Sequence, residues 1–419
     1  NGESSMAKII IRSYPNLRTC TLGIVTRRGA AYDSLAGTTQ VLLQTMVRGT
    51  SNYSEMDIAN LIDGTGGSFF STTEKDFAII GAQVQPKYAE RTLELLFDII
   101  LHPELEENHF LIEKLNLIQI FQQVQSNSLR RMLLFDADKA VFGETHPLGR
   151  PQIGTEESLN MISSEDLHYA HHNFLIEPWG FAIGTVPNEL QTRLTHQFST
   201  FFSNQKNMIQ KIQKFPHRSV PSKNYVFSPD KADHNAYLCV NVTTEVSPDI
   251  MGLARFSSAL LGESFGSRMF SVLRDKKSFG YIVGSSIKLI DTHLIIRCFM
   301  ETNPKRTEEA LDSLMELIID LGINLIKNEE YQTTHDFILG TLDLSFDDSR
   351  TITGKMISRE VHGLPPDIES GYEETRVVTP KKVHSWWKTL MTPENFSIAV
   401  SGNFDFSDLE SKWKSQLIQ

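Results

Sequence analysis

The chain has 419 residues, of which 40% are hydrophobic and 22% are charged, a composition typical of a soluble protein with room for two domains of about 200 residues each. Its formal net charge of −11 disfavours a phosphate backbone or an anionic membrane surface as a partner and suits peptides, especially basic ones. No uncharged apolar run is long enough to span a bilayer, so we expect neither a nucleic-acid partner nor a membrane span.

Compartment is only weakly indicated by the sequence. The chain starts Asn1-Gly2-Glu3, without the cationic and apolar segments of a signal peptide, but the first residue is not Met, which leaves a removed leader open. Its cysteines, Cys20, Cys239 and Cys298, are far apart and odd in number, which argues against a disulfide framework. These features favour the cytoplasm, with the periplasm as the alternative if a leader has been removed.

The first half opens with a strand-like stretch at residues 21–33, TLGIVTRRGAAYD, followed by GTTQVLLQTMVRGT at residues 37–50. The second stretch is typical of a helix with Val41, Leu42 and Met46 in the core. Residues 69–84, FFSTTEKDFAIIGAQV, alternate in places, and we predict a polar strand there. Ordinary sheet pairing is the simplest role for this strand, and pairing of a strand edge with an extended peptide is expected in a partner instead.

A group of histidines occurs in LHYAHHNF, where His168, His171 and His172 have the i, i+3, i+4 spacing of one helical face. Imidazoles at this spacing can bind a metal, but no acid or cysteine falls on the same face. We therefore set a metal site aside here. No Ser-His-Asp or Cys-His arrangement can be assembled from local motifs either, although residues distant in sequence could meet in space.

The two halves of the chain repeat each other. The helical pattern of residues 90–100, ERTLELLFDII, recurs 218 positions later in EEALDSLMELI, residues 308–318. Near the ends of the halves, PWGFAI at residues 178–183 is matched 215 positions later by PENFSI, each leading into a strand. Coincidence would explain one such pair, whereas two pairs at nearly equal offsets favour a duplication.

We therefore predict an α+β fold of two homologous domains, each a sheet covered by helices, forming a clamshell. The order within each half is predicted as strand, helix, strand, helices and a final strand. Proline-bounded polar turns in FPHRSVPSK place the linker at residues 215–223. The domains are accordingly residues 1–214 and 224–419.

The segment from Gly37 to Thr50 resembles the zinc-binding segment of pitrilysin-type peptidases, a family that includes insulinase-like and mitochondrial-processing-peptidase-like members. In that family a helix reads G-x-x-His-x-x-Glu-His and leads through an apolar stretch to Lys-Gly-Thr. Aligned without a gap, the histidine positions hold Gln40 and Gln44, and the glutamate position holds Leu43. GGSF at residues 66–69 and HPLGRP at residues 146–151 extend the resemblance, which covers essentially the whole chain.

The resemblance implies that this chain has lost its own metal site. Two histidines four residues apart bind zinc, and the carboxylate between them accepts a proton from the bound water. Glutamine amides are poor zinc ligands, and leucine cannot accept a proton. The third ligand position of the family falls on Ile120, beside Gln119, and Glu113 is the only acid left nearby. We therefore expect no metal or other cofactor in this chain.

Residues 260–286, LLGESFGSRMFSVLRDKKSFGYIVGSS, resemble the C-terminal signature of the same family, and Arg274 and Tyr281 match its arginine and tyrosine. The resemblance implies that these two stabilise the oxyanion formed at the scissile carbonyl and hold the peptide. The alternatives are that Arg274 caps a helix end and that Tyr281 packs in a strand. Gly262 and Gly266 suggest a turn, because no Gly-Lys-Ser/Thr of a phosphate loop follows them.

Keeping this pair while losing the zinc motif is the pattern of the non-catalytic subunit in heterodimeric members of the family. The sequence therefore predicts a zinc-less subunit of a metalloendopeptidase that is inactive alone and contributes Arg274 and Tyr281 to the zinc site of a homologous partner. Self-association is the alternative assembly, and a non-enzymatic scaffold or peptide-binding subunit is the alternative function. The sequence does not identify the peptide substrate.

Overall fold

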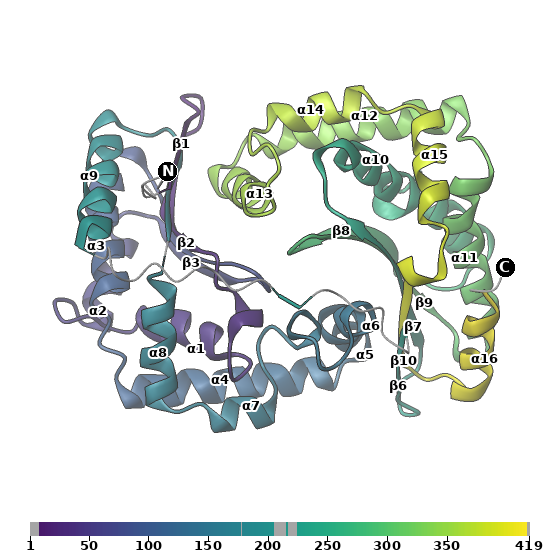
Figure 1. The fold of residues 1–419 in the computed structure, drawn as a ribbon, viewed down its shortest axis with the longest axis horizontal. Helices are drawn as coiled ribbons and strands as arrows, with labels where there is room; N and C mark the ends of the chain where they lie inside the picture. The colour runs from purple at the N-terminus through teal and green to yellow at the C-terminus, as the bar shows by residue number, and fades with distance from the viewer. Residues whose placement is uncertain (1–7, 177, 205–214, 217–223, 417–419) are drawn as a thin grey trace. The chain divides into compact units, whose positions relative to one another are not determined.

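The computed structural model describes residues 8–176, 178–204, 215–216 and 224–416. It contains two compact units that interleave along the chain. The first consists of Asn1–Gln122, Pro151–Phe215 and Ser345–Ile357, and the second of Gln123–Arg150, Pro216–Leu344 and Ser358–Gln419. Each unit is built on one five-stranded sheet (Figure 1).

The strands of the first sheet are β1 (Ile9–Ser13), β2 (Cys20–Thr26), β3 (Ser68–Thr73), β4 (Ala78–Val84) and β5 (Trp179–Gly184). The strands of the second sheet are β6 (Tyr225–Pro229), β7 (Ala236–Glu245), β8 (Val283–Ile290), β9 (His293–Thr302) and β10 (Phe396–Gly402).

The α-helices are α1 (Thr38–Met46), α2 (Glu55–Asp63), α3 (Ala89–Leu101), α4 (Glu107–Gln125), α5 (Ser128–Arg131), α6 (Ala137–Phe142), α7 (Glu156–Met161), α8 (Ser164–Phe174), α9 (Asn188–Asn204), α10 (Pro248–Ser258), α11 (Thr307–Ile323), α12 (Asn328–Ser345), α13 (Ser349–Val361), α14 (Glu369–Arg376), α15 (Pro380–Leu390) and α16 (Phe406–Gln416). Short 3-10 turns are η1 (Ala30–Tyr32), η2 (Pro86–Tyr88), η4 (Pro147–Gly149), η7 (Pro304–Arg306) and η8 (Pro393–Asn395). Wider π-helical turns are η3 (Met132–Asp136), η5 (Ala259–Glu263) and η6 (Phe270–Lys276).

The two sheets have the same topology. Their strand orders are β1-β5-β2-β4-β3 and β6-β10-β7-β9-β8, so that each strand of one sheet has a counterpart in the other. In both sheets the first strand pairs parallel with the last, and every other pairing is antiparallel. The predicted α+β class with two domains is confirmed, and the shared topology is what a duplication produces.

The central strands are buried on both faces. Every residue of β2, β5 and β10 is buried, whereas the edge strand β3 is mostly accessible to solvent. Strands covered on both faces read as nearly continuous apolar runs, as in GFAIG and SIAVSG. In the first unit one face of the sheet packs against α3 and α9, and in the second unit against α11 and α15.

The opposite face of each sheet is covered by a segment from the other half of the sequence. In the first unit, the start of α13 lies on the sheet, where the hydroxyl of Ser349 is 2.6 Å from that of Thr21 and Gln83 donates to Asp348 at 2.6 Å. In the second unit, α5, η3 and α6 take this place, and Arg131 donates to the Ser228 carbonyl at 2.7 Å. The two compact units therefore have different boundaries from the two halves of the sequence repeat.

Most predicted elements are present, with three differences. The predicted helices at residues 90–100 and 308–318 are α3 and α11, and Val41, Leu42 and Met46 of α1 are buried as predicted. The single strand predicted at residues 69–84 is wrong: the segment folds into the hairpin β3–β4, turning at Glu74–Phe77. The predicted strand at residues 21–33 ends at Thr26, and β1 was not predicted.

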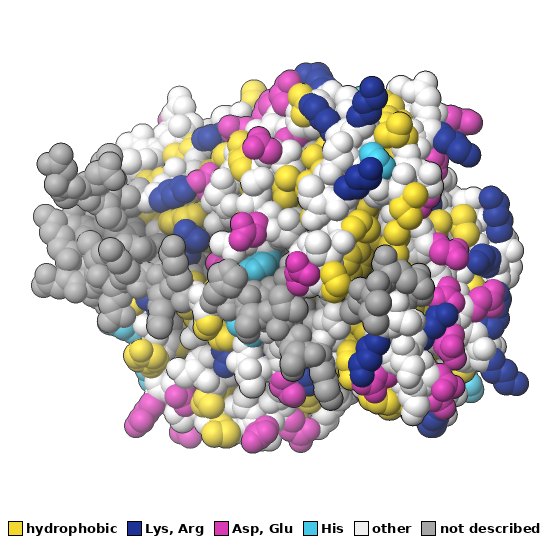
Figure 2. All heavy atoms as spheres, turned by 45° about the vertical axis from the view of Figure 1, so that its right-hand side comes forward, with side chains coloured by type: hydrophobic (Ala, Val, Ile, Leu, Met, Phe, Trp, Pro, Cys, Tyr) yellow, Lys and Arg dark blue, Asp and Glu magenta, His cyan; other side chains and the backbone are white. Residues whose placement is uncertain are grey.

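Of the predicted linker at residues 215–223, residues 217–223 lie outside the described part of the chain. Within the described residues, no helix is long and apolar enough to cross a membrane. On the face shown in Figure 2, acidic and basic side chains are interspersed over the surface. Among the described residues on that face, this mixture leaves no continuous basic area for a nucleic acid.

Candidate functional site

The segment that aligns with a zinc site is built around α1. Gly37 precedes the helix with φ of +96°, and a Cβ there would lie 2.6 Å from the Ile153 carbonyl oxygen, so the position requires glycine. Asp33 then fixes the first turn by accepting from the Thr39 amide at 3.0 Å and the Thr39 hydroxyl at 2.6 Å. This holds the start of α1 in one place.

The side chains at the aligned ligand positions are two amides and two aliphatic chains. Leu43 is fully buried in the core, while Gln40 and Gln44 are half-buried and the Gln44 Oε1 has no hydrogen-bond partner among the described residues. Ile120, on α4, is 41% exposed. Two amides and two aliphatic chains do not suit zinc, which binds thiolate, imidazole and carboxylate groups.

The remaining acid near these positions, Glu113 on α4, is already paired. It is buried and accepts from the Arg48 Nε at 2.7 Å, and Arg48 also forms an ion pair with Glu55. The hydrogen bond from Arg48 to Glu113 raises the pKa of the guanidinium. Because Arg48 follows α1 directly, this pair ties α1 to α4 and leaves Glu113 in a structural role.

The histidines of α8 are also not arranged as a metal site. His171 is half-buried and its Nε2 lies 2.7 Å from the Ile100 carbonyl oxygen, and burial lowers its pKa. His168 and His172 are exposed on the helix surface. Across the described residues, no group of three or more His, Cys, Asp and Glu side chains is placed to hold a metal ion.

The second candidate region is a surface cluster formed by Phe265, Phe270, Arg274 and Tyr281, all in the second unit. The Phe265 and Phe270 rings are 5.3 Å apart in an edge-to-face arrangement. The Arg274 guanidinium lies 5.3 Å from the Phe270 ring and 5.7 Å from the Tyr281 ring. The fold thus brings the two predicted residues, Arg274 and Tyr281, together through one cation–π contact.

Tyr281 does not pack in a strand. It lies in the loop before β8, and 83% of its surface is exposed. The loop itself is fixed, because the Ile282 carbonyl accepts from the Glu301 amide at 2.8 Å, and a Cβ on Gly280 would lie 2.7 Å from the Glu301 carbonyl oxygen. Phe279 is buried and anchors the same loop. The phenol is therefore presented to solvent from a rigid backbone.

Arg274 is positioned by η6, in which the preceding Leu273 is fully buried. Its guanidinium is half-buried and contacts the Phe270 and Tyr281 rings. Gly266 lies in a turn between η5 and the helical segment that follows, as predicted, whereas Gly262, also predicted in a turn, lies within η5. The sequence analysis did not identify Phe265, which is 82% exposed, although a phenylalanine between serine and glycine in a turn was a usable signal.

Two regions of the chain match family profiles. Residues 8–156 match the profile described as insulinase (peptidase family M16), and residues 162–335 match the one described as peptidase M16 inactive domain. Among curated relatives, the uncharacterized zinc protease YmxG of Bacillus subtilis is 22% identical over 408 residues, covering 94% of this chain and 97% of the relative. The human mitochondrial-processing peptidase subunit beta is 28% identical over 153 residues, covering 36% and 31%.

Solved structures share the fold. A crystal structure described as a peptidase M16 inactive domain from Pseudomonas fluorescens superposes with a TM-score of 0.83 at 17% identity, covering 96% of this chain and 97% of that one. A chain of complex III2 from Candida albicans superposes with a TM-score of 0.80 at 15% identity, with 97% of each chain covered.

Proposed function

Because the chain belongs to the insulinase-like peptidase family M16, we propose that it is a zinc-less subunit of a heterodimeric metalloendopeptidase. In this role it binds no zinc, since Gln40, Leu43, Gln44 and Ile120 occupy the positions that would supply ligands and base. It is inactive alone, and a zinc-bearing homologue completes the enzyme. The substrate is a peptide.

The observation that carries this proposal is the contact between the exposed Tyr281 and the half-buried Arg274. Burial does not account for Tyr281, which is 83% exposed on a loop fixed by Glu301, and the Arg274 guanidinium lies 5.7 Å from its ring. A phenol and a guanidinium side by side donate hydrogen bonds to one oxygen as it gains negative charge. Neither donor can itself supply the attacking water, which is why the partner's site is required.

The test is cleavage of a quenched fluorescent peptide by the chain reconstituted with a zinc-bearing homologue from the same genome. The wild-type pair should cleave and should lose activity with chelator. Tyr281→Phe removes one donor and should lower turnover by about 10²- to 10³-fold, with assembly unchanged. Arg274→Ala should also weaken peptide binding and so raise KM.

A control away from this site is Lys87→Ala, since the Lys87 ammonium also lies over a ring, that of Tyr88 at 4.7 Å, but is exposed in η2 of the first unit. This variant should cleave at the wild-type rate. Wild-type rates from both the Tyr281→Phe and Arg274→Ala complexes would make the chain a scaffold or peptide-binding subunit instead. Chelator-resistant cleavage by the isolated chain would refute the proposal outright.

A further inference from the structure

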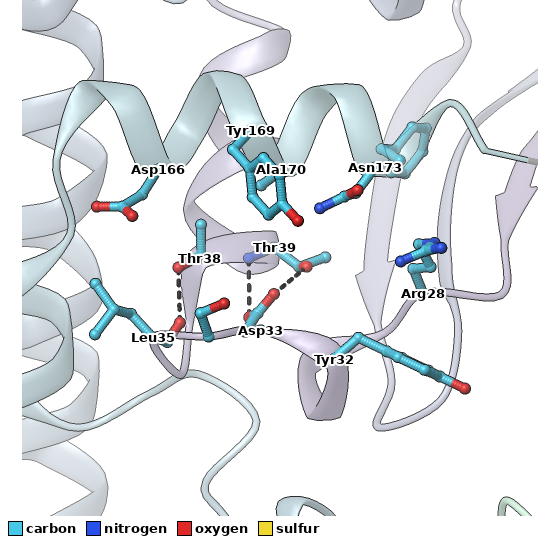
Figure 3. Close-up of a pocket in the computed structure, with 12 residues that line it drawn as sticks. Arg28, Tyr32, Asp33, Leu35, Thr38, Thr39, Asp166, Tyr169, Ala170 and Asn173 are labelled. Carbon is cyan, nitrogen blue, oxygen red and sulfur yellow. Dashed lines mark hydrogen bonds between the residues drawn. The ribbon is translucent and has the colours of Figure 1, made fainter. Parts of the chain in front are cut away.

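A second site is suggested by a pocket in the first unit, between the start of α1 and helix α8. Figure 3 shows Tyr169 and Asn173 of α8 facing the segment that carries Asp33 and Thr39, with Arg28 at one end of the pocket and Asp166 at the other. Its inner volume of about 50 Å³ exceeds the ~10–15 Å³ that one water needs. None of Gln40, Leu43, Gln44 and Ile120 lines it.

Both carboxylates of this pocket are engaged by local structure. Asp33 accepts two hydrogen bonds from Thr39 at the first turn of α1. Asp166 closes the capping box of α8, accepting from the Ser163 hydroxyl at 2.6 Å and the Ser163 amide at 2.8 Å, and these bonds lower its pKa. These contacts tie both acids to the starts of their helices.

The hydrogen-bond donors at the Arg28 end of the pocket have fewer partners than the two carboxylates. The Arg28 Nε is buried and has no hydrogen-bond partner within the described part of the chain. Figure 3 shows the Tyr169 hydroxyl and the Asn173 amide pointing into the same space. A buried donor without an acceptor carries a desolvation penalty, which an acceptor group of a ligand would remove. A guanidinium with an amide and a phenol beside it matches the oxygens of a carboxylate.

We propose that this pocket binds the carboxylate of a small zwitterionic ligand, either a free amino acid or the C-terminus of a short peptide, with Arg28 as its anchor. Asp166, at the opposite end, complements the amino group of such a ligand. Arg28, Tyr169 and Asn173 act as donors to the carboxylate oxygens. The site belongs to the first unit alone, so binding needs neither a partner subunit nor peptide cleavage, and it does not rest on the function proposed above.

The experiment uses the isolated full chain and three probes: L-alanine, the dipeptide Ala-Ala and Ala-Ala amide, titrated by saturation-transfer NMR. Ala-Ala should bind saturably, and its amide at least about tenfold more weakly, because the amide lacks the charged oxygens that pair with Arg28. Comparable binding of L-alanine would assign the site to free amino acids, and much weaker binding would assign it to peptide C-termini. Either result supports a carboxylate site.

The variant Arg28→Gln should reduce the affinity for Ala-Ala to that for the amide. The matched control is Arg27→Gln, because Arg27 lies over the Trp179 ring at 5.7 Å and does not line the pocket. It should leave binding unchanged. If Arg28→Gln does not fold, Tyr169→Phe provides the test, since Tyr169 is 63% exposed and the loss of its hydroxyl should weaken binding about threefold.

Three results would overturn the proposal: equal affinity for the acid and the amide, equal loss from the Arg27 and Arg28 variants, or no saturable binding of any probe. These outcomes are independent of the cleavage assay. A chain that fails here but supports cleavage in the reconstituted pair would lose only the carboxylate pocket.

Discussion

The α1 segment and the loop carrying Tyr281 resemble two motifs of the same family, but the side chains at the motif positions differ in their exposure to solvent. In α1, Leu43 at the position of the catalytic carboxylate is fully buried. In the second unit, Tyr281 is 83% exposed. An apolar side chain gains from leaving water, so Leu43 stabilises the fold where a carboxylate would have served chemistry. An exposed tyrosine makes no such contribution, and its position calls for another explanation.

Backbone rigidity does not explain the difference. Both segments have glycines that no other residue could replace without a clash, Gly37 before α1 and Gly280 before Tyr281. Both are also held by hydrogen bonds, from Thr39 to Asp33 and from Glu301 to Ile282. The backbone is thus fixed in both segments, and the two segments differ in the exposure of Leu43 and Tyr281. The comparison predicts that substitution of the buried Leu43 changes stability and that substitution of the exposed Tyr281 does not.

The largest effect is expected at Leu43. Leu43→Glu, which restores the family's carboxylate, would place a charge in a fully buried position and should cost on the order of 5 kcal/mol of unfolding free energy. This is comparable with the total stability of many domains, so the variant should be largely unfolded. The conservative Leu43→Met should cost less than about 1.5 kcal/mol. Urea unfolding followed by circular dichroism measures both.

If Leu43→Glu were as stable as the wild type, the α1 segment would be open to solvent like the Tyr281 loop, and the contrast between the two regions would fail. The same measurement bears on repair of the zinc motif. Gln40→His, Leu43→Glu and Gln44→His together should not produce a peptidase, because Ile120 still leaves the third ligand position without a donor.

The next effect concerns the ion pair between Arg48 and Glu113. Arg48→Met leaves the buried Glu113 carboxylate without its main partner and should cost about 3 kcal/mol. The double variant Arg48→Met/Glu113→Met removes both charges and should recover most of this loss. The double-variant cycle is measured by denaturant unfolding at neutral pH. Additive losses instead of recovery would show that the pair does not hold α1 against α4.

A smaller, pH-dependent effect is expected at His171, which lies on α8, the helix that packs against α1. Burial is the main cause that lowers the pKa of His171 below the ordinary 6.5. The hydrogen bond to Ile100 raises this pKa, and the charges of His168, His172 and His102 lower it further. Below pH 6.5 the unfolded chain therefore binds the proton more readily than the folded one, and stability falls as the pH drops toward the folded-state pKa.

His171→Gln keeps a polar side chain opposite the Ile100 carbonyl but does not titrate. Its unfolding free energy should decline less than that of the wild type between pH 7.5 and pH 5.5. Parallel declines in the two proteins would assign the acid sensitivity to other groups. The control His172→Gln, at an exposed position on the same helix, should follow the wild type.

Sequence patterns predicted the parts of this fold that depend on local periodicity. The helices α3 and α11 have apolar residues at helical spacing, and PWGFAI and PENFSI both lead into buried final strands. The hairpin β3–β4 was read as one strand because its turn, Glu74-Lys75-Asp76-Phe77, contains neither glycine nor proline. The sequence did not predict that each sheet is covered by a segment from the other half of the chain, because contacts such as that between Thr21 and Ser349 join residues far apart in sequence.

The candidate functional residues likewise include some that the sequence identified and some that only the structure brings together. The resemblance to the family's C-terminal signature identified Arg274 and Tyr281, and in the fold the Arg274 guanidinium lies 5.7 Å from the Tyr281 ring. The pocket at Arg28 was not found, because its residues come from two segments with no motif in common and become neighbours only when α8 packs against the start of α1. Periodicity also does not predict exposure: Phe265 is 82% exposed, and its only sequence signal was its place between serine and glycine in a turn.

The smallest effect is expected in the second region, where Phe265→Ser and Tyr281→Ser should each change the unfolding free energy by no more than about 0.5 kcal/mol, as exposed positions generally do. The matched control is Phe279→Ser, because Phe279 lies in the loop of Tyr281 but is 5% exposed, and losing its ring should cost about 3–5 kcal/mol. Thermal and urea unfolding of the three variants gives the comparison directly. A loss above 1 kcal/mol for Tyr281→Ser would mean that its ring supports Arg274 structurally through the cation–π contact, and the exposed pair would then no longer argue for a role in peptide chemistry.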